Sequence, residues 1–163
     1  MGQHYLRPLF APKSVAIFGA SDHDDSVGKI VFHNMLQSGY QGALYPINPN
    51  HDKIQGHKAF ASIALIPEPI DLAIIATPPK SVPEIIEECG KHNVKAAVII
   101  TAGFGEAGTA GEKLEQAVLE NAKRYNIRLI GPNCLGVMRP DIGLNATFNH
   151  DSANTGNLAF VSQ

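Results

Sequence analysis

The sequence predicts an α/β fold, a doubly wound parallel sheet of about five strands. Two observations carry this prediction. Short apolar runs that suit buried parallel strands alternate along the chain with segments whose apolar residues recur at helical spacing. Each strand run is followed by a loop of Gly, Pro and small polar residues, where open α/β sheets bind their ligands. The expected architecture is therefore Rossmann-like.

Composition narrows the function classes. The chain has 163 residues, of which 44% are hydrophobic, and this suits one domain with a full core. A formal net charge of -2, without a basic run interleaved with aromatics, argues against nucleic acid as a partner. No apolar run approaches the roughly 20 residues that span a bilayer, and residues 1–12 lack a signal-peptide core. We therefore expect a cytoplasmic protein without membrane attachment.

The first predicted unit is a strand over 14–18, a polar loop and a helix over 27–38. Gly19 permits a tight turn after the strand, and Gly28 lets a ligand approach the first turn of the helix. Ser26 is expected to cap the helix and Gly39 to end it in the left-handed conformation. The predicted buried stripe of this helix is Val27, Ile30, Val31 and Met35. Free N–H groups at the helix start would attract a diphosphate.

The second predicted strand, over 43–47, indicates which ligand the loop holds. It ends in Pro46-Ile47-Asn48-Pro49, without the acidic residue that usually binds the ribose hydroxyls of a dinucleotide. This favours coenzyme A over NAD. The signal is weaker from 49 to 69, where we expect a loop over 53–56 and a short helix or irregular turn over 59–66.

The remaining elements follow the same alternation. Strands are predicted over 72–76, 96–100 and 127–130. Ser-x-x-Glu and Thr-x-x-Glu spacings at Ser81 and Thr109 predict capping boxes for two helices, the second ending near Tyr125. The predicted apolar stripes are Val82, Ile85, Ile86 and Cys89 in the first of these helices, and Leu114, Ala117, Val118 and Ala122 in the second.

Five loops at strand ends should converge on one crevice, because the carboxyl ends of parallel strands share one edge of the sheet. The loops are 19–28, 46–49, 77–79, 101–108 and 131–136. This convergence predicts a cofactor site.

These loops carry motifs that resemble a known family. They are Gly19-Ala20-Ser21 with Ser26-Val27-Gly28, Pro46-Ile47-Asn48-Pro49, Thr77-Pro78-Pro79, Ile100-Thr101-Ala102-Gly103-Phe104 and Gly131-Pro132-Asn133-Cys134-Leu135-Gly136. In this order they resemble the CoA-binding domain that opens the NDP-forming (ADP-forming) acyl-CoA synthetases. That domain is related to the succinyl-CoA synthetase alpha subunit and also occurs at the N-terminus of bacterial protein lysine acetyltransferases.

The resemblance implies a coenzyme A site. Its phosphates would meet Gly19, Ser21, Val27 and Gly28. Pro46, Asn48 and Pro49 would line the adenosine end, and Lys53 would suit the ribose phosphate. Thr77, Pro78 and Pro79 would flank the nucleotide and pantetheine. Thr101, Ala102, Gly103 and Asn133 would lie near the thiol.

Several residues carry a second interpretation. Asp22, Asp24 and Asp25 place carboxylates in the phosphate loop, so they must point to solvent or weaken binding. Lys53 is equally well explained as a solvated loop lysine, and the glycines of 101–108 as turn formers. Cys134 suits a small buried residue better than a nucleophile. Cys89 and Cys134 form no CxxC pair, and His51 and His57 lack a third ligand, so we expect no disulfide and no metal site.

The predicted domain occupies 1–150, and 151–163 is expected to be a linker and the first strand of a following domain. The run 156–163 resembles the strand that opens the family's second domain. In the synthetases a phosphohistidine of a later domain relays phosphate, and in the acetyltransferases a separate domain transfers the acetyl group. None of the seven histidines here falls in a matching motif. By this resemblance the chain is non-catalytic alone, and its partners are CoA and the remaining domains: a second CoA-ligase-like domain and an ATP-grasp or acetyltransferase domain.

Two other functions stay open on the sequence. One is an NAD-binding domain of an oxidoreductase or redox-sensing regulator, which the fold and the glycine loop would also serve. The other is a stand-alone CoA-responsive regulatory domain.

Overall fold

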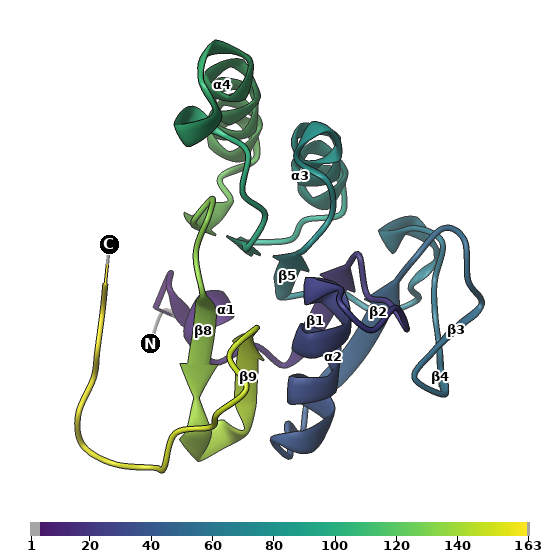
Figure 1. Ribbon diagram of the computed structural model, residues 1–163, viewed down its shortest axis with the longest axis vertical. Helices are drawn as coiled ribbons and strands as arrows, with labels where there is room; N and C mark the ends of the chain where they lie inside the picture. The colour runs from purple at the N-terminus through teal and green to yellow at the C-terminus, as the bar shows by residue number, and fades with distance from the viewer. Residues whose placement is uncertain (1–3, 163) are drawn as a thin grey trace.

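A computed structural model of the chain describes residues 4–162. Five parallel strands form its central sheet (Figure 1). In chain order they are β1 (Ser14–Phe18), β2 (Ala43–Ile47), β5 (Leu72–Ile75), β6 (Ala96–Ile99) and β7 (Arg128–Ile130). The spatial order is β2-β1-β5-β6-β7, so the predicted doubly wound sheet is confirmed. The chain moves outward from β1 to β2 and then returns to the other side of β1, which makes the β1/β5 junction the topological switch point.

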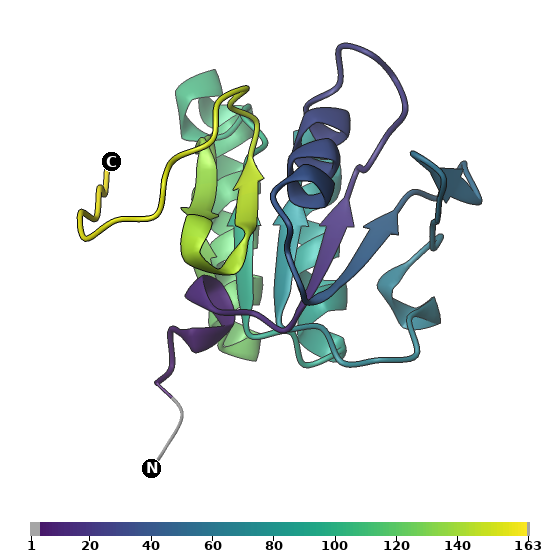
Figure 2. The same ribbon diagram turned by 90° about the horizontal axis from the view of Figure 1, so that it is seen from below.

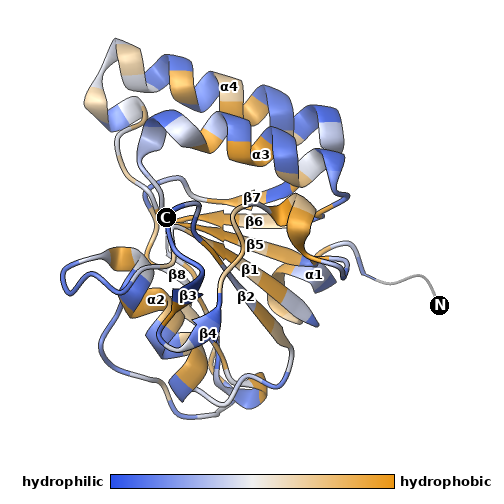
Figure 3. Ribbon diagram, turned by 90° about the vertical axis from the view of Figure 1, so that its right-hand side faces the viewer, coloured by the Kyte–Doolittle hydropathy of each residue, from blue (hydrophilic) through white to orange (hydrophobic). Residues whose placement is uncertain are grey.

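Two layers cover the sheet. Helices α3 (Val82–Lys91) and α4 (Thr109–Tyr125) lie on one face. The other face carries α1 (Arg7–Phe10), α2 (Val27–Gln37) and an antiparallel hairpin of β8 (Gly136–Arg139) and β9 (Leu144–Thr147). Figure 2 shows α2 and this hairpin side by side in front of the sheet. The central strands are mostly hydrophobic, whereas α3 and α4 alternate hydrophobic and hydrophilic residues (Figure 3).

Each strand contributes side chains to the hydrophobic clusters on both faces of the sheet, because successive side chains point to opposite faces. Phe18 and Ile75 pack in the cluster that contains Ile86 of α3 and Val118 of α4. Their neighbours Ile17 and Ile74 pack with Phe32 of α2 on the other face. Continuous burial of these strands explains why they appear in the sequence as unbroken apolar runs.

Helix α2 begins and ends as predicted. The Lys29 N–H donates to Ser26 Oγ at 3.0 Å, and Gly39 adopts a φ of 77° just beyond the helix. The predicted stripe is partly wrong: Val31 and Met35 are buried, but Phe32 takes the place of Val27, which is 37% exposed. Val27 is the first helical residue and lies at the loop rather than over the sheet.

Both predicted capping boxes are wrong. Ser81 has helical backbone angles because a 3-10 turn, Pro79–Ser81, runs directly into α3, whereas a capping residue needs an extended conformation. Its hydroxyl donates instead to Pro78 O at 2.8 Å and lies 3.0 Å from Thr77 Oγ1. Thr109 is already inside α4, since Gly108 takes the N-cap position with a φ of 83°.

The segment 49–69, where the sequence signal is weak, contains more regular structure than predicted. The expected loop at 53–56 is wrong: β3 (Lys53–Ile54) and β4 (His57–Lys58) form a short hairpin that turns at Gln55 and Gly56. The short helix expected within 59–66 is present as the 3-10 helix Ile63–Leu65. Further 3-10 turns are Gly105–Ala107 and Pro140–Ile142.

The predicted strand over 156–163 is absent from residues 156–162, which are exposed and irregular, while Gln163 lies outside the described residues. A strand needs neighbours that satisfy its backbone groups, and residues 156–162 have no such pairing. Within 4–162, none of the helices has the length and apolar character that a membrane span requires.

Candidate functional site

The five strand-end loops meet at the carboxyl edge of the sheet, as the sequence predicts. Asn48 follows β2 and Ala20 follows β1. The Asn48 Nδ2 group donates a hydrogen bond to Ala20 O at 2.9 Å. Gly19 packs directly on the end of β5, because a Cβ on Gly19 would lie 2.6 Å from Ala76 O. The loops on either side of the switch point are therefore fixed to one another.

The chain of contacts continues across the other half of the sheet. Thr101 Oγ1 donates to Thr77 O at 2.8 Å, and this joins the loops after β6 and β5. The Asn133 N–H donates to Thr101 O at 3.0 Å, and this adds the loop after β7. Gly103 packs on Pro79, whose ring would lie 2.9 Å from a Cβ at position 103. One connected group of loops thus spans all five strand ends.

The loop after β1 presents backbone donors. Among residues 4–162, the N–H groups of Ser21, Val27 and Gly28 have no recorded hydrogen-bond partner. Val27 and Gly28 open α2, an 11-residue helix whose dipole adds partial positive charge at this end. Gly28 has a structural role as well, because a Cβ there would lie 1.8 Å from Gly19 O. The arrangement suits an anion with several acceptor oxygens.

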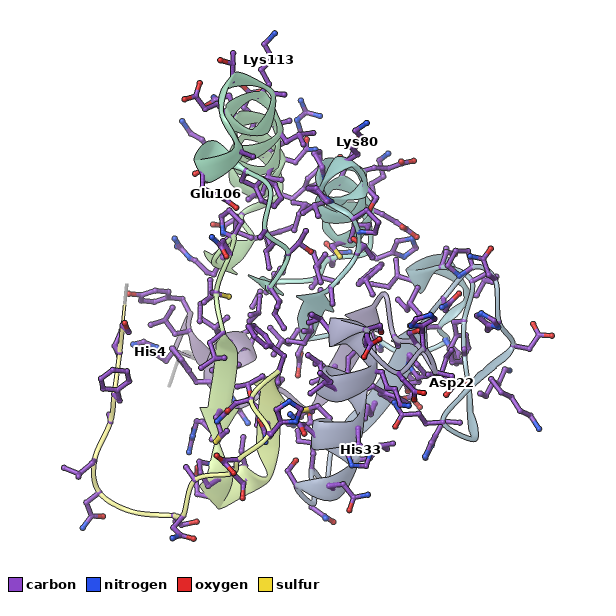
Figure 4. All side chains as sticks on the ribbon, in the orientation of Figure 1. His4, Asp22, His33, Lys80, Glu106 and Lys113 are labelled. Carbon is purple, nitrogen blue, oxygen red and sulfur yellow. The ribbon has the colours of Figure 1, made fainter. Side chains whose placement is uncertain are left out.

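The three acidic residues of this loop are exposed, and two of them have partners. Asp22, which is labelled in Figure 4, accepts the Gln55 N–H at 2.8 Å. Asp24 pairs with Lys29, and the hydrogen bond from that ammonium lowers the pKa of the Asp24 carboxyl. Asp22 therefore ties the loop to the β3–β4 hairpin, and the Lys29 ammonium offsets the charge of Asp24.

The other predicted site residues differ in exposure. Pro49, Lys53, Pro78, Ala102 and Asn133 are exposed, while Pro46 is buried. Lys53 lies on β3, directly opposite Lys58 of β4. Asn133 adopts a φ of 52°, the left-handed conformation that asparagine tolerates better than most residues.

Side chains that the sequence did not single out shape these loops, chiefly those of Glu106 and Gln55. Glu106 accepts the Gly103 N–H at 2.6 Å and the Phe104 N–H at 3.2 Å, and Gly105 N–H donates to Glu115. These backbone hydrogen bonds, that from Gly103 first, lower the pKa of Glu106. Gln55 is the second residue, and its Gln-Gly position in a short hairpin was the available signal.

Neither cysteine has the character of a nucleophile. Cys89 is fully buried and burial raises the pKa of its thiol. Cys134 is half-buried, burial also raises its pKa, and its thiol donates to Ile99 O at 3.3 Å. Both thiols are free. Residues 4–162 contain no group of three or more His, Cys, Asp or Glu that could hold a metal ion.

A cavity of about 480 Å³ lies along α2, beside the strand-end loops. Its lining includes Asp24 of the loop after β1 and Lys29 of the first turn of α2. The remaining lining residues are Ile30, His33, Asn34, Gln37, Ser38, Asn145, His150 and Ser152.

Residues 13–140 match a family model described as a CoA binding domain. The chain is 48% identical over 163 residues to an ADP-forming acetate–CoA ligase of Methanocaldococcus jannaschii, covering 99% of this chain and 23% of that protein. It is 41% identical to the alpha subunit of ADP-forming acetate–CoA ligase I of Pyrococcus furiosus, covering 97% of this chain and 35% of the subunit. The chain thus spans about a quarter to a third of these relatives.

Solved structures agree. The chain superposes on PH0766 from Pyrococcus horikoshii with a TM-score of 0.84 at 45% identity, covering 88% of this chain and 33% of that one. A dinucleotide forming acetyl-coenzyme A synthetase 1 from Ca. Korarchaeum cryptofilum, solved with phosphate and ADP, gives a TM-score of 0.83 at 39% identity. That match covers 88% of this chain and 30% of the synthetase.

Proposed function

The chain belongs to the CoA-binding domain family, and we propose that it is the coenzyme A-binding domain of a larger ADP-forming acyl-CoA synthetase. It would hold CoA so that the CoA thiol can react in an active site formed by other domains. The observation that carries this proposal is the group of unpaired N–H donors at Ser21, Val27 and Gly28, located at the switch point of the sheet.

The residues present fit the ligand. CoA carries a diphosphate, and one backbone donor in the loop after β1 together with two at the start of α2 suits its oxygens without requiring a charged side chain. Pro46, Asn48 and Pro49 would border the adenosine end, with Lys53 near the ribose phosphate. Thr77, Pro78 and Pro79 would flank the middle of the molecule, and Thr101, Ala102, Gly103 and Asn133 the thiol end. The thiol chemistry itself is supplied by CoA.

Asn48 supports CoA over NAD. A dinucleotide-binding domain uses an acidic side chain near the end of the second strand to accept hydrogen bonds from ribose. Here the side chain at that point donates to Ala20 O and accepts from Asn50 N–H, so both of its functional groups are engaged within the protein. A carboxylate could not make the first of these bonds.

The relatives suggest the nature of the parent protein. Those reported above are named as ADP-forming acetate–CoA ligases, and this favours a synthetase over an acetyltransferase. The chain is also 44% identical to a 4-hydroxybutyrate–CoA ligase of Nitrosopumilus maritimus. The relatives therefore do not indicate which acyl group the parent protein would use. The domain would occupy 1–150, with 151–163 leading to a second CoA-ligase-like domain and an ATP-grasp domain. Two free cysteines suit a cytoplasmic location.

Isothermal titration of this chain with CoA tests the proposal, with NAD titrated separately as the control. We expect saturable binding of CoA and none of NAD. Binding of NAD without CoA, or binding of neither ligand, would contradict the function proposed for this chain.

A further inference from the structure

The β3–β4 hairpin is fixed against three parts of the candidate site. At its base, Phe60 N–H donates to Pro46 O and Asn48 N–H donates to Phe60 O, and this anchors the hairpin to the end of β2. On its inner side, Ile54 is fully buried in the core beneath α2. The ring of His57 meets Phe32 of α2 edge to face, with centroids 5.7 Å apart. The hairpin is therefore packed against the rest of the domain rather than being a free loop.

The tip of the hairpin is tied to the phosphate loop by one residue. Gln55 donates its N–H to Asp22 Oδ1 at 2.8 Å and its Nε2 to Lys29 O at 3.0 Å. The same Nε2 lies 3.5 Å from Ser21 O. Asp22 lies on the side of the molecule that carries the hairpin (Figures 1 and 4). Gln55 thus contacts the loop after β1 and the first turn of α2, the two segments that present the unpaired N–H groups.

The backbone conformation of Gln55 indicates that these contacts serve the site. Its φ is 47°, a left-handed conformation that costs free energy in glutamine and that glycine or asparagine would adopt more easily. From this turn, the Gln55 side chain extends to the Lys29 carbonyl. Such strained positions persist where the surrounding contacts outweigh the strain, and they gather at ligand sites.

The hairpin also places two like charges together. Lys53 and Lys58 are directly opposite each other in the register of β3 and β4, and both are exposed. Like charges at directly opposed positions destabilise a strand pair. The ammonium of Lys58 lies 5.1 Å from the centre of the Phe60 ring. Neither lysine forms a recorded ion pair within residues 4–162. An anion between them would relieve their repulsion.

We propose that the β3–β4 hairpin is a second phosphate-binding element, in which Lys58 joins Lys53 as a cation and Gln55 is the positioning residue that fixes the hairpin on the phosphate loop. This inference rests on the proposed function. CoA carries a phosphate on its ribose in addition to its diphosphate, and the helix start accounts for the diphosphate alone. The hairpin would bind the remaining phosphate and so distinguish CoA from dephospho-CoA, which lacks it.

The test is calorimetric titration of CoA and dephospho-CoA against the unaltered chain and three variants. K58Q removes one cation, and we expect it to weaken CoA about tenfold while dephospho-CoA changes less than about twofold. Q55G removes the side-chain tie and relaxes the turn. It should weaken CoA about fivefold, with the thermal midpoint unchanged or raised. K113Q, on the exposed face of α4, is the matched control and should leave both affinities unchanged.

The outcomes separate this inference from the proposed function. If the unaltered chain binds CoA and dephospho-CoA equally, or if K58Q weakens both to the same extent, the hairpin proposal is overturned and CoA binding stands. If Q55G leaves the preference for CoA intact, the positioning role of Gln55 is overturned. If the unaltered chain binds neither ligand, the proposed function itself fails.

Discussion

Gly28 faces the carbonyl group of Gly19 so closely that a Cβ on Gly28 would lie 1.8 Å from the Gly19 oxygen. The first turn of α2 therefore packs directly on the start of the phosphate loop. Glycine at position 28 is required by the backbone even before a ligand is considered.

Replacing Gly28 with alanine should destabilise the domain. The added methyl group must displace backbone atoms, and overpacking of this kind lowers the free energy of unfolding by about 3 kcal/mol. Urea denaturation measures the change. G156A is the control, because a Cβ there would meet nothing within 4 Å, and it should unfold like the unaltered chain. Equal midpoints for G28A and G156A would contradict the packing described.

Replacing Ser26 with alanine should cost about 1 kcal/mol of stability, since it removes the side-chain acceptor that caps the Lys29 N–H. Thermal unfolding followed by circular dichroism checks the effect. The matched control is S62A, because Ser62 precedes the 3-10 helix Ile63–Leu65 without making a cap hydrogen bond. A larger loss for S62A than for S26A would show that the cap is unimportant.

Replacing Asn48 with aspartate should weaken CoA binding about tenfold. The variant keeps the acceptor for Asn50 N–H but loses the bond from Nδ2 to Ala20 O, so two carbonyl-type oxygens would face each other. Calorimetry with CoA measures the loss, and N50D, two residues along the same loop, provides the control. Unchanged CoA affinity in N48D would remove the argument that this amide joins the two loops.

The contribution of Glu106 to the stability of the domain should depend on pH. Its folded-state pKa is lowered from 4.5 by the N–H groups of Gly103 and Phe104, so its stabilising effect is present above 4.5 and is lost as pH falls through the lower folded value. E106Q should therefore unfold at a lower temperature than the unaltered chain at pH 7, with the difference shrinking in acid. Scanning calorimetry at pH 7 and pH 3 measures both differences. A constant difference would contradict the role of the charge.

The sheet and the converging loops were predictable because buried parallel strands carry a strong apolar signal and their loops begin where it stops. Ser26 was also predictable, since its extended backbone leaves the hydroxyl free to cap α2. Ser81 was not, because the prolines before it form a 3-10 turn that a spacing rule ignores. The tie from Gln55 depends on a contact with Lys29, 26 residues away in sequence, and no local pattern reports such a contact.

The connected loops also determine how the domain would open. Hydrogen bonds and close packing join the ends of all five strands, so no single strand can detach locally without disturbing the same edge. A ligand held there would slow amide hydrogen exchange across the whole sheet, because every opening motion would have to release it first. At a concentration of about 100 times its dissociation constant, it would add about 2.7 kcal/mol to the free energy of unfolding.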